Sequence, residues 1–357
     1  MWNSVHHAIS VCGGALTVQQ PKRIRVHYFF RKPRKAENYS VERLFGTVTS
    51  ELPQDRFIVR HFVCPLHSTG VIRRLMLMVW AGLNQGDINH LTGDIDFVGL
   101  LMRKRQTVVT ILDAGSLHRL RGWRRKVYEL FWLRLPLMRA GQIITISEAT
   151  RQEIEPFAVR AKHSIKVIPA CVTVRPESCP RQFRSSCPRV LHVGTKPNKN
   201  LERVVAALRG LGCELVVIGK LTQEQSHLLE QSEIRYENHV GLSDRELIDQ
   251  YHAADLVTFV STYEGFGLPI LEAQALGRPL ITSDREPMWS VAGTGAKLVD
   301  PTNVDELRRG IQDIIQDAAL RKTLIRAGLE NVKRFSPASV ASRYATLYQE
   351  MYKPACQ

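Results

Sequence analysis

The chain has 357 residues, a length that suggests about two domains. Its hydrophobic (44%) and charged (23%) residues occur in the proportions of a soluble globular protein, and its apolar stretches are too short to span a bilayer. Residues 1–20 lack the pattern of a secretory signal, and the seven cysteines form no CxxC pair, so we expect reduced thiols in a cytoplasmic protein. The net charge of +15 predicts an acidic partner: a nucleic acid, an anionic membrane or a phosphorylated substrate.

From residue 23 onward, short β-branched runs alternate with longer helical runs, the pattern of a parallel α/β sheet. Residues 1–22 are expected to be irregular. The predicted strands cover 24–30, 57–63, 87–91, 107–112, 141–147 and 164–170. The predicted helices cover 40–52, 71–83, 122–141 and a segment capped by Ser147. Together these elements predict an N-terminal Rossmann-like domain over residues 1–171.

Residues 172–188 are rich in proline, serine and arginine and are the best candidate for a linker. A second α/β series then begins. Its predicted strands cover 189–194, 213–219, 239–241, 255–261 and 278–283. Its predicted helices begin near Leu201, Thr222, Ser243 and Pro269, and two more cover 304–335. We expect a C-terminal domain over 189–335, a last helix in 336–357 that packs back on the N-terminal domain, and a ligand cleft between the domains.

The most informative stretch is DLVTFVSTYEGFGLPILEAQALGRPLITSD (255–284), which reads as strand, glycine-containing loop, helix and strand. Gly265 and Gly267 allow close backbone approach, and Pro269 suits the first turn of a helix. The loop therefore presents backbone N–H groups and a positive helix end to an anion. Glu264 and Glu272 bracket this anion site, where a carboxylate is useful for binding hydroxyl groups. An anion site with hydroxyl acceptors is what a nucleotide-sugar requires.

The segment EGFGLPILE, with YHAADLVTFVST before it and ALGRPLITSD after it, closely resembles the E-x7-E donor signature of the GT-B retaining glycosyltransferases of family 4 (glycosyl transferases group 1). The resemblance covers most of 189–350 and is weaker over 87–170. It implies that Glu264 contacts the hydroxyls of the transferred sugar and that Glu272 holds the ribose hydroxyls. It also implies that the backbone around Gly265, Phe266, Gly267 and Leu268 faces the sugar and the diphosphate.

A second strand, glycine loop and helix, VLHVGTKPNKNLERVV (190–205), agrees with this resemblance. Lys199 is expected to reach the diphosphate, as in the family's "VG…KN" loop, with Gly194 and Thr195 lining the site. Asn198 stands where many relatives carry an arginine, and Lys196 is the nearest substitute for the missing charge. Gly219 and Lys220, which end another predicted strand, are further candidates for the nucleotide pocket.

On the acceptor side, the resemblance points to segments 87–101 and 107–120. Asp113 at a strand end is the best acceptor-side candidate, with a structural turn as the alternative. Many relatives carry a histidine just before this aspartate, where this chain has Leu112; His90 or His118 are candidates to replace it, although His90 fits a core position equally well. The Asp94–Ile95–Asp96 pair is the metal-binding pattern of a different glycosyltransferase fold, and we expect no metal here.

Positive charge concentrates in residues 103–134, with Trp123, Phe131 and Trp132 among the arginines. This surface suits an anionic membrane on the inner face of the cell, or a phosphorylated acceptor, about equally. No nucleic-acid-binding module is recognisable in the sequence, so we expect no nucleic-acid partner.

The resemblance implies hexosyl transfer from a UDP-, GDP- or ADP-sugar to a glycan or lipid-linked acceptor, with retention of configuration and without a cofactor. Cell-surface polysaccharide or lipopolysaccharide synthesis is the expected setting. Two alternatives remain open at this point. One is a sugar-nucleotide epimerase, and the other is a catalytically impaired nucleotide-binding partner of another glycosyltransferase, which the Leu112 and Asn198 departures favour.

Overall fold

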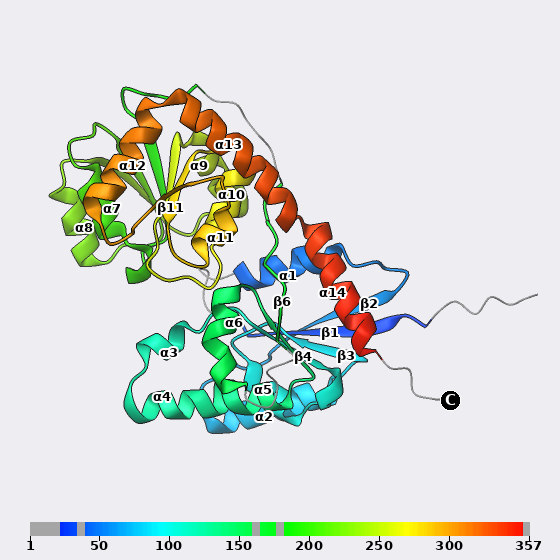
Figure 1. Cartoon of the computed structure of the whole chain (residues 1–357). Helices are drawn as coiled ribbons and strands as arrows, with labels where there is room; N and C mark the ends of the chain where they lie inside the picture. Colours follow the sequence, from blue (N-terminus) through cyan, green and yellow to red (C-terminus); the bar gives the residue numbers. More distant parts are fainter. Residues whose placement is uncertain (1–21, 34–39, 159–164, 176–181, 353–357) are drawn as a thin grey trace, which may run out of the picture.

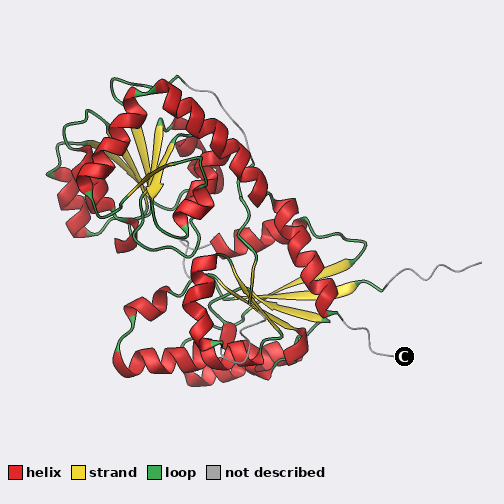
Figure 2. Cartoon of the chain, viewed as in Figure 1, coloured by secondary structure: helices red, strands yellow, loops and turns green. Residues whose placement is uncertain are grey.

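The computed structural model describes residues 22–33, 40–158, 165–175 and 182–352. These residues form two α/β domains, each built on a six-stranded parallel sheet with helices on both faces (Figure 1 and Figure 2). This architecture confirms the predicted fold class of two Rossmann-like domains. Among the described helices, none combines the length and apolar content needed to cross a membrane.

The N-terminal sheet has the strand order β2-β1-β3-β4-β5-β6. Its strands are β1 (Ile24–Phe30), β2 (Phe57–Val63), β3 (Ile88–Leu91), β4 (Thr107–Ile111), β5 (Gln142–Thr145) and β6 (Ile165–Val167). Its helices are α1 (Ser40–Ser50), α2 (Val71–Leu83), α3 (Gly115–Arg119), α4 (Gly122–Tyr128), α5 (Leu135–Arg139) and α6 (Glu148–Ile154). The single helix predicted over 122–141 is instead divided by a π-helical segment at Glu129–Arg134. Pro136 in the first turn of α5 lacks an N–H to donate to the preceding turn, which accounts for the altered hydrogen bonding there.

The C-terminal sheet has the order β12-β11-β10-β7-β8-β9. Its strands are β7 (Arg189–Val193), β8 (Glu214–Ile218), β9 (Arg235–His239), β10 (Leu256–Phe259), β11 (Leu280–Ser283) and β12 (Lys297–Val299). Its helices are α7 (Leu201–Leu208), α8 (Gln223–Glu230), α9 (Asp244–Ala253), α10 (Leu268–Ala275), α11 (Met288–Ala292), α12 (Val304–Gln316) and α13 (Ala318–Val332). The strand predicted at 239–241 is wrong, because β9 ends at His239. β9 lies at the edge of the sheet and carries polar residues, so the sequence contains no apolar run that would indicate a strand there.

Each sheet has a point where the chain reverses its direction of strand addition. In the C-terminal sheet this switch lies between β7 and β10, and in the N-terminal sheet it lies between β1 and β3. Loops that leave the carboxyl ends of such neighbouring strands diverge and leave a crevice, the usual ligand site of open α/β sheets. The loops after β7 and β10 contain Lys199 and Glu264, respectively.

The last helix, α14 (Pro337–Met351), returns to the N-terminal domain, where it packs against α1 (Figure 1). The Tyr348 hydroxyl lies 2.6 Å from the Tyr28 hydroxyl of β1 and 2.6 Å from Nδ1 of His90. Upstream, Val172 and Val174 are buried, and the Val172 N–H donates to the Phe335 carbonyl. The polypeptide therefore crosses between the domains twice, at 172–174 and at 335–337, and both crossings are packed.

Candidate active site

Lys199 and Glu264 meet at the switch point of the C-terminal sheet. Nζ of Lys199 donates to Oε1 of Glu264 at 2.7 Å, and both side chains are largely buried. Gly194 makes this approach possible: it has φ of +100°, and a Cβ placed on it would lie 2.8 Å from Cγ of Lys199. A glycine at the end of β7 therefore lets the lysine stem pass over the backbone and reach the loop that follows β10.

Asn198 holds the same carboxylate in place. Its Nδ2 donates to the Tyr263 carbonyl at 2.9 Å and to Oε1 of Glu264 at 3.2 Å. The Thr262 N–H donates in turn to the Asn198 carbonyl at 2.8 Å. Asn198 thus joins the two loops through hydrogen bonds from an uncharged amide.

The loop after β10 leads directly into α10. Gly267 adopts a left-handed conformation with φ of +111°, which glycine tolerates without strain. Phe266 is buried against the Phe335 ring, with 5.8 Å between centroids, and fixes the loop to the domain core. Within the described chain, the start of α10 has no side-chain cap, so the Gly267 and Leu268 N–H groups are available to an anion. Pro269 has no N–H, and the Ile270 N–H donates to the Gly267 carbonyl at 3.0 Å.

Glu272 lies one turn into α10 and is almost completely buried, at 3% exposure. Its Oε2 accepts a hydrogen bond from the Tyr251 hydroxyl at 2.8 Å. Its Oε1 accepts from Nη2 of Arg43 at 2.9 Å, and Nη1 of Arg43 also contacts Asp244 at 2.7 Å. Glu272 is the residue expected to hold the ribose, and both of its carboxylate oxygens therefore already have protein partners. The N-terminal domain supplies one of these partners, Arg43.

The loops after β7 and β8 contact each other at Thr195, whose hydroxyl donates to the Lys220 carbonyl at 2.6 Å. A Cβ on Gly219 would lie 3.1 Å from the Thr195 hydroxyl, so glycine keeps these loops close together. The side chains of Lys196 and Lys220 are exposed. They contribute positive charge beside the switch point.

The N-terminal domain contacts the donor loop directly. A Cβ on Gly265 would lie 2.2 Å from the Leu112 carbonyl oxygen and 2.8 Å from Cβ of Asp113. The Tyr263 hydroxyl donates to Oε2 of Glu153 at 2.9 Å and accepts from the Ala114 N–H at 3.1 Å. Burial and the neighbouring Glu153 carboxylate raise the pKa of Tyr263, which keeps this phenol protonated. Asp113 itself is exposed and accepts from the Gly115 N–H at 2.8 Å, a turn contact.

His118 lies beside the same contact, whereas His90 does not. Nε2 of His118 is 3.2 Å from Glu153, and its ring packs edge-on against the Tyr263 ring at 4.9 Å. His90 is 0% exposed, and its ring nitrogens lie 2.6 Å from the Tyr348 and Thr110 hydroxyls. The expectation that His90 contacts substrate is therefore corrected: it is a core histidine that joins β3 to β4 and α14.

The two aspartates of the Asp-x-Asp pair occupy different environments. Asp94 is half-exposed and forms an ion pair with Arg31. Asp96 is buried, and burial together with the nearby Asp94 charge raises its pKa well above the usual range. Among the described residues, no three His, Cys, Asp or Glu side chains come close enough to hold a metal ion.

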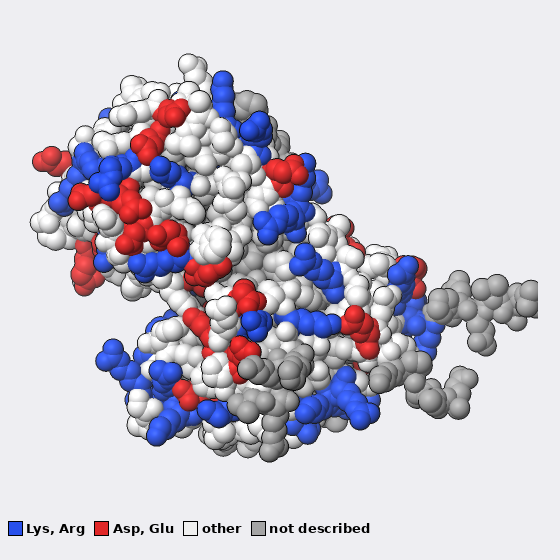
Figure 3. Space-filling view, viewed as in Figure 1, with Lys and Arg blue, Asp and Glu red and all other residues white. Residues whose placement is uncertain are grey.

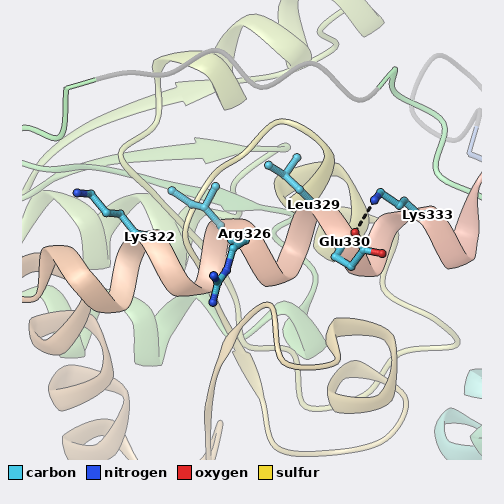
Figure 4. A pocket seen from close by; sticks show the side chains of 6 residues that line it. Lys322, Arg326, Leu329, Glu330 and Lys333 are labelled. Carbon is cyan, nitrogen blue, oxygen red and sulfur yellow. Dashed lines mark hydrogen bonds and ion pairs between the residues drawn. The ribbon is translucent and has the colours of Figure 1, made fainter.

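The surface has two hollows outside the loops that contain Lys199 and Glu264. One, of about 230 Å³, lies where β1, β2 and β3 end, at the switch point of the N-terminal sheet, and is lined by residues that include Arg31, Lys32, His67 and Asp94. The other, of about 420 Å³, follows one face of α13 (Figure 4). Five of its six lining residues belong to α13 and the sixth, Lys333, follows it directly; none belongs to the loops around Lys199 and Glu264.

Four residues at this site were not singled out from the sequence: Arg43, Tyr251, Tyr263 and Glu153. Tyr251 and Tyr263 belong to the segment that carries the resemblance, so their proximity to the two glutamates offered a signal. Arg43 and Glu153 lie in the other domain, 229 residues from Glu272 and 110 residues from Tyr263, respectively. Only the folded arrangement of the two domains brings them to the donor loop.

Comparison with known proteins agrees with this geometry. Residues 183–331 match the family model of glycosyl transferases group 1. The chain is 29% identical over 236 residues to the O-antigen chain mannosyltransferase B of Escherichia coli, covering 59% of this chain and 61% of that protein.

Solved structures resemble nearly the whole chain. HepE from Anabaena, in complex with UDP and glucose, has a TM-score of 0.70 at 17% identity and covers 92% of this chain and 100% of its own. Sucrose-phosphate synthase from Thermosynechococcus elongatus has a TM-score of 0.73 at 18% identity, covering 92% and 99%. These likenesses confirm a two-domain GT-B fold.

Proposed function

We propose that this protein is a retaining glycosyltransferase of family 4 that transfers a hexosyl unit from a nucleotide-sugar to a glycan or lipid-linked acceptor. The observation that carries the proposal is the pairing of Lys199 with Glu264, 2.7 Å apart, between the loops that follow β7 and β10. The pair combines a cation for the diphosphate with a carboxylate for sugar hydroxyls. The uncapped start of α10 at Leu268 adds anion-binding N–H groups beside it.

In the proposed reaction, the bond between the sugar C1 and the diphosphate oxygen breaks. A bond between C1 and the acceptor oxygen forms on the same face, and the acceptor proton passes to the leaving diphosphate. Lys199 and the N-terminus of α10 stabilise the negative charge that develops on that diphosphate. Glu264 orients the sugar through its hydroxyls, and Glu272 holds the ribose. Catalysis then rests on positioning and charge stabilisation, with no cofactor.

The donor is proposed to be a UDP-, GDP- or ADP-sugar, and the setting to be the synthesis of cell-surface polysaccharide or lipopolysaccharide. The support comes from the similar proteins, which include an O-antigen chain mannosyltransferase and a structure with bound UDP and glucose. The matched region spans 61% of the mannosyltransferase, so its activity reaches this chain only as a proposal.

The acceptor is proposed to bind against the N-terminal domain, beside Asp113 and in the 230 Å³ hollow at the ends of β1, β2 and β3. The hollow combines the paired Arg31 and Asp94 with Lys32 and His67, a set of donors and acceptors suited to the hydroxyls of a sugar. Its volume is of the order of one hexose ring.

A membrane surface is proposed as a further partner, on the cytoplasmic side. α2 exposes a row of large apolar side chains: Val71, Ile72, Leu75, Met76, Val79 and Leu83. The neighbouring α4–α5 segment exposes Trp123, Val127, Leu130, Phe131 and Met138. The Arg74 guanidinium lies 4.5 Å above the Trp132 ring and joins the two helical segments into one face. Lys and Arg side chains gather along this lower edge of the N-terminal domain (Figure 3), as an anionic bilayer requires.

One observation favours the alternative of a nucleotide-binding partner without catalysis. The Leu112 backbone, at the place of the relatives' histidine, packs directly against Gly265 of the donor loop. The resemblance implies a histidine able to contact the reacting sugar at this position, and this chain has an apolar leucine there. The epimerase alternative has no comparable support in the geometry.

The experiment that tests the proposal measures nucleotide release from a panel of UDP-, GDP- and ADP-sugars, with and without membrane extract as a source of acceptor. Lys199→Met is compared with Lys322→Met, which removes an exposed lysine of α13 far from the site. Extract-dependent release from one donor, lost in Lys199→Met and retained in Lys322→Met, supports the transferase. Nucleotide binding without release from any donor would favour the non-catalytic alternative. Release of nucleotide that does not depend on an added acceptor would favour the epimerase.

A further inference from the structure

Arg43 extends from the first turns of α1 in the N-terminal domain onto the C-terminal domain. Its Nη2 lies 2.9 Å from Oε1 of Glu272, and its Nη1 lies 2.7 Å from Oδ1 of Asp244 in the first turn of α9. One guanidinium group therefore bridges two carboxylates that belong to different helices of the other domain. This planar, forked arrangement is one that a lysine cannot reproduce.

The contact covers the carboxylate that the proposed function assigns to the ribose. The Glu272 side chain is 4% exposed, with Tyr251 on one oxygen and Arg43 on the other. A ribose hydroxyl needs direct contact with one of these oxygens to donate a hydrogen bond. Since Tyr251 is itself fully buried in the C-terminal domain, Arg43 is the partner that can withdraw, by moving away with its own domain.

The opposite end of the donor loop is held by the N-terminal domain as well. Tyr263 contacts Glu153 and the Ala114 N–H, and Gly265 packs directly against the Leu112 backbone. A sugar ring bound next to Gly265 would require these backbones to separate by several ångströms. The segment from Tyr263 to Glu272 is thus clamped at both ends, and the described conformation is a closed one.

We propose that Arg43 is a positioning residue that latches the two domains together in the absence of donor, and that the Arg43–Glu272 contact and nucleotide binding exclude each other. The proposal rests on the proposed function only in assigning Glu272 to the ribose. Opening of the interface releases Arg43 from Glu272 and Asp244 and uncovers the ribose site. The observed donor affinity then equals the intrinsic affinity of the open site multiplied by the fraction of molecules that are open.

The test measures binding of UDP, GDP and ADP by calorimetry to the wild-type protein and to Arg43→Ala, Arg43→Lys and Asp244→Ala. Arg60→Ala, which removes an exposed arginine of β2, is the matched control. Arg43→Ala is expected to bind the preferred nucleotide about 5- to 150-fold more tightly, the usual range of coupling between two sites. Asp244→Ala and Arg43→Lys, which each keep part of the bridge, are expected to give smaller gains, and Arg60→Ala none.

Small-angle X-ray scattering without nucleotide supplies a readout independent of binding. Arg43→Ala is expected to show a larger radius of gyration than the wild type, at an unchanged secondary-structure content. Weaker or unchanged nucleotide affinity in both Arg43→Ala and Asp244→Ala would overturn the latch. If none of the proteins binds a nucleotide, the proposed function fails, and the latch still stands or falls on whether the radius of gyration rises.

Discussion

Lys199 and Glu264 form an ion pair across the switch point of the C-terminal sheet, with Nζ 2.7 Å from Oε1. The ammonium of Lys199 also lies 4.6 Å from the centre of the Phe259 ring, so a cation–π contact helps to hold its charge in place. Each member of the pair holds the other in place. A diphosphate arriving at this point meets a cation whose position is already determined, which is the condition for strong electrostatic catalysis.

Lys199→Met is expected to lower kcat by about 100- to 1000-fold, the usual loss on removing one preorganised charge-stabilising group. The substitution also leaves the Glu264 carboxylate without its cation, next to a negatively charged ligand. Nucleotide release under saturating donor is the measurement. Lys199→Arg, which retains the charge, is expected to recover part of the rate, and equal rates in Lys199→Met and the wild type would remove Lys199 from the mechanism.

Glu272→Gln is expected to raise the donor KM by about 10- to 100-fold, because hydrogen bonds to a charged group contribute about 1.5–3 kcal/mol. Glutamine keeps the shape of the side chain and one oxygen acceptor, so the Tyr251 contact can persist. Steady-state kinetics over a donor concentration series separates this effect on KM from one on kcat. A fall in kcat alone, at constant KM, would argue against a ribose contact.

Gly265→Ala is expected to force the domains apart. The added Cβ would lie 2.2 Å from the Leu112 carbonyl oxygen, a distance that requires a backbone to move. We expect a larger radius of gyration and a lower melting temperature than in the wild type. Gly46→Ala in α1 is the control, since its Cβ would meet nothing within 4 Å and alanine favours the helix by about 0.5–1 kcal/mol. Equal scattering profiles for the two variants would contradict the closed interface.

Two buried histidines are expected to make the protein sensitive to acid. Burial lowers the pKa of His90 to about 3 and that of His192 to about 4, against about 6.5 in an unfolded chain. Between these values the unfolded state binds a proton that the folded state does not. The free energy of unfolding therefore falls as the pH drops below 6.5, by about 1.4 kcal/mol per pH unit for each histidine.

Urea denaturation at a series of pH values from 7.5 to about 4.5 measures this slope. His90→Gln is expected to reduce the slope by one histidine's share, while His227→Gln at an exposed position of α8 serves as the control. An identical slope in the wild type and His90→Gln would show that His90 is not the group responsible.

The apolar face of α2 is expected to bind anionic vesicles. Replacing Ile72 and Met76 together by aspartate removes two exposed apolar side chains and adds charge of the wrong sign. Since a buried apolar side chain contributes about 1.5–3 kcal/mol, flotation with phosphatidylglycerol vesicles is expected to fall by at least about tenfold. Val240→Asp, at an exposed position of the C-terminal domain, is the control. Equal flotation of the double variant and the control would exclude this face.

Element prediction succeeded where a segment carries a strong local pattern. The strand at 57–63 and the helix at 71–83 have the predicted bounds, because each is a long run with one period. The helix predicted to begin near Ser243 does so, and Ser243 and Glu246 form a capping box at its start. Short elements escaped: α3, α11 and β12 have three to five residues and depend on packing against the sheets rather than on their own pattern.

The candidate site could likewise be predicted only where the local sequence specifies the backbone. The strand, loop and helix around Glu264 could be predicted because Gly265, Gly267 and Pro269 specify the local backbone. The partners of the two glutamates could not. The Arg43–Glu272 contact depends on the relative orientation of two domains, and no local pattern in α1 distinguishes Arg43 from any other arginine on a helix surface. Asn200 illustrates the same limit: it directly precedes α7, yet its side chain donates to the Val260 and Pro301 carbonyls instead of capping the helix.

The position of α14 also determines the order in which the chain can mature during synthesis. Tyr28, in the first strand, finds its hydroxyl partner in Tyr348, 320 residues later. Nδ1 of His90 likewise gains its hydrogen-bond partner only when Tyr348 is in place. While the ribosome is still translating the C-terminal domain, the N-terminal sheet therefore stands with an uncovered face and unpaired polar groups inside it. The N-terminal domain is synthesised first, yet it is completed only when α14, which is synthesised last, packs against it.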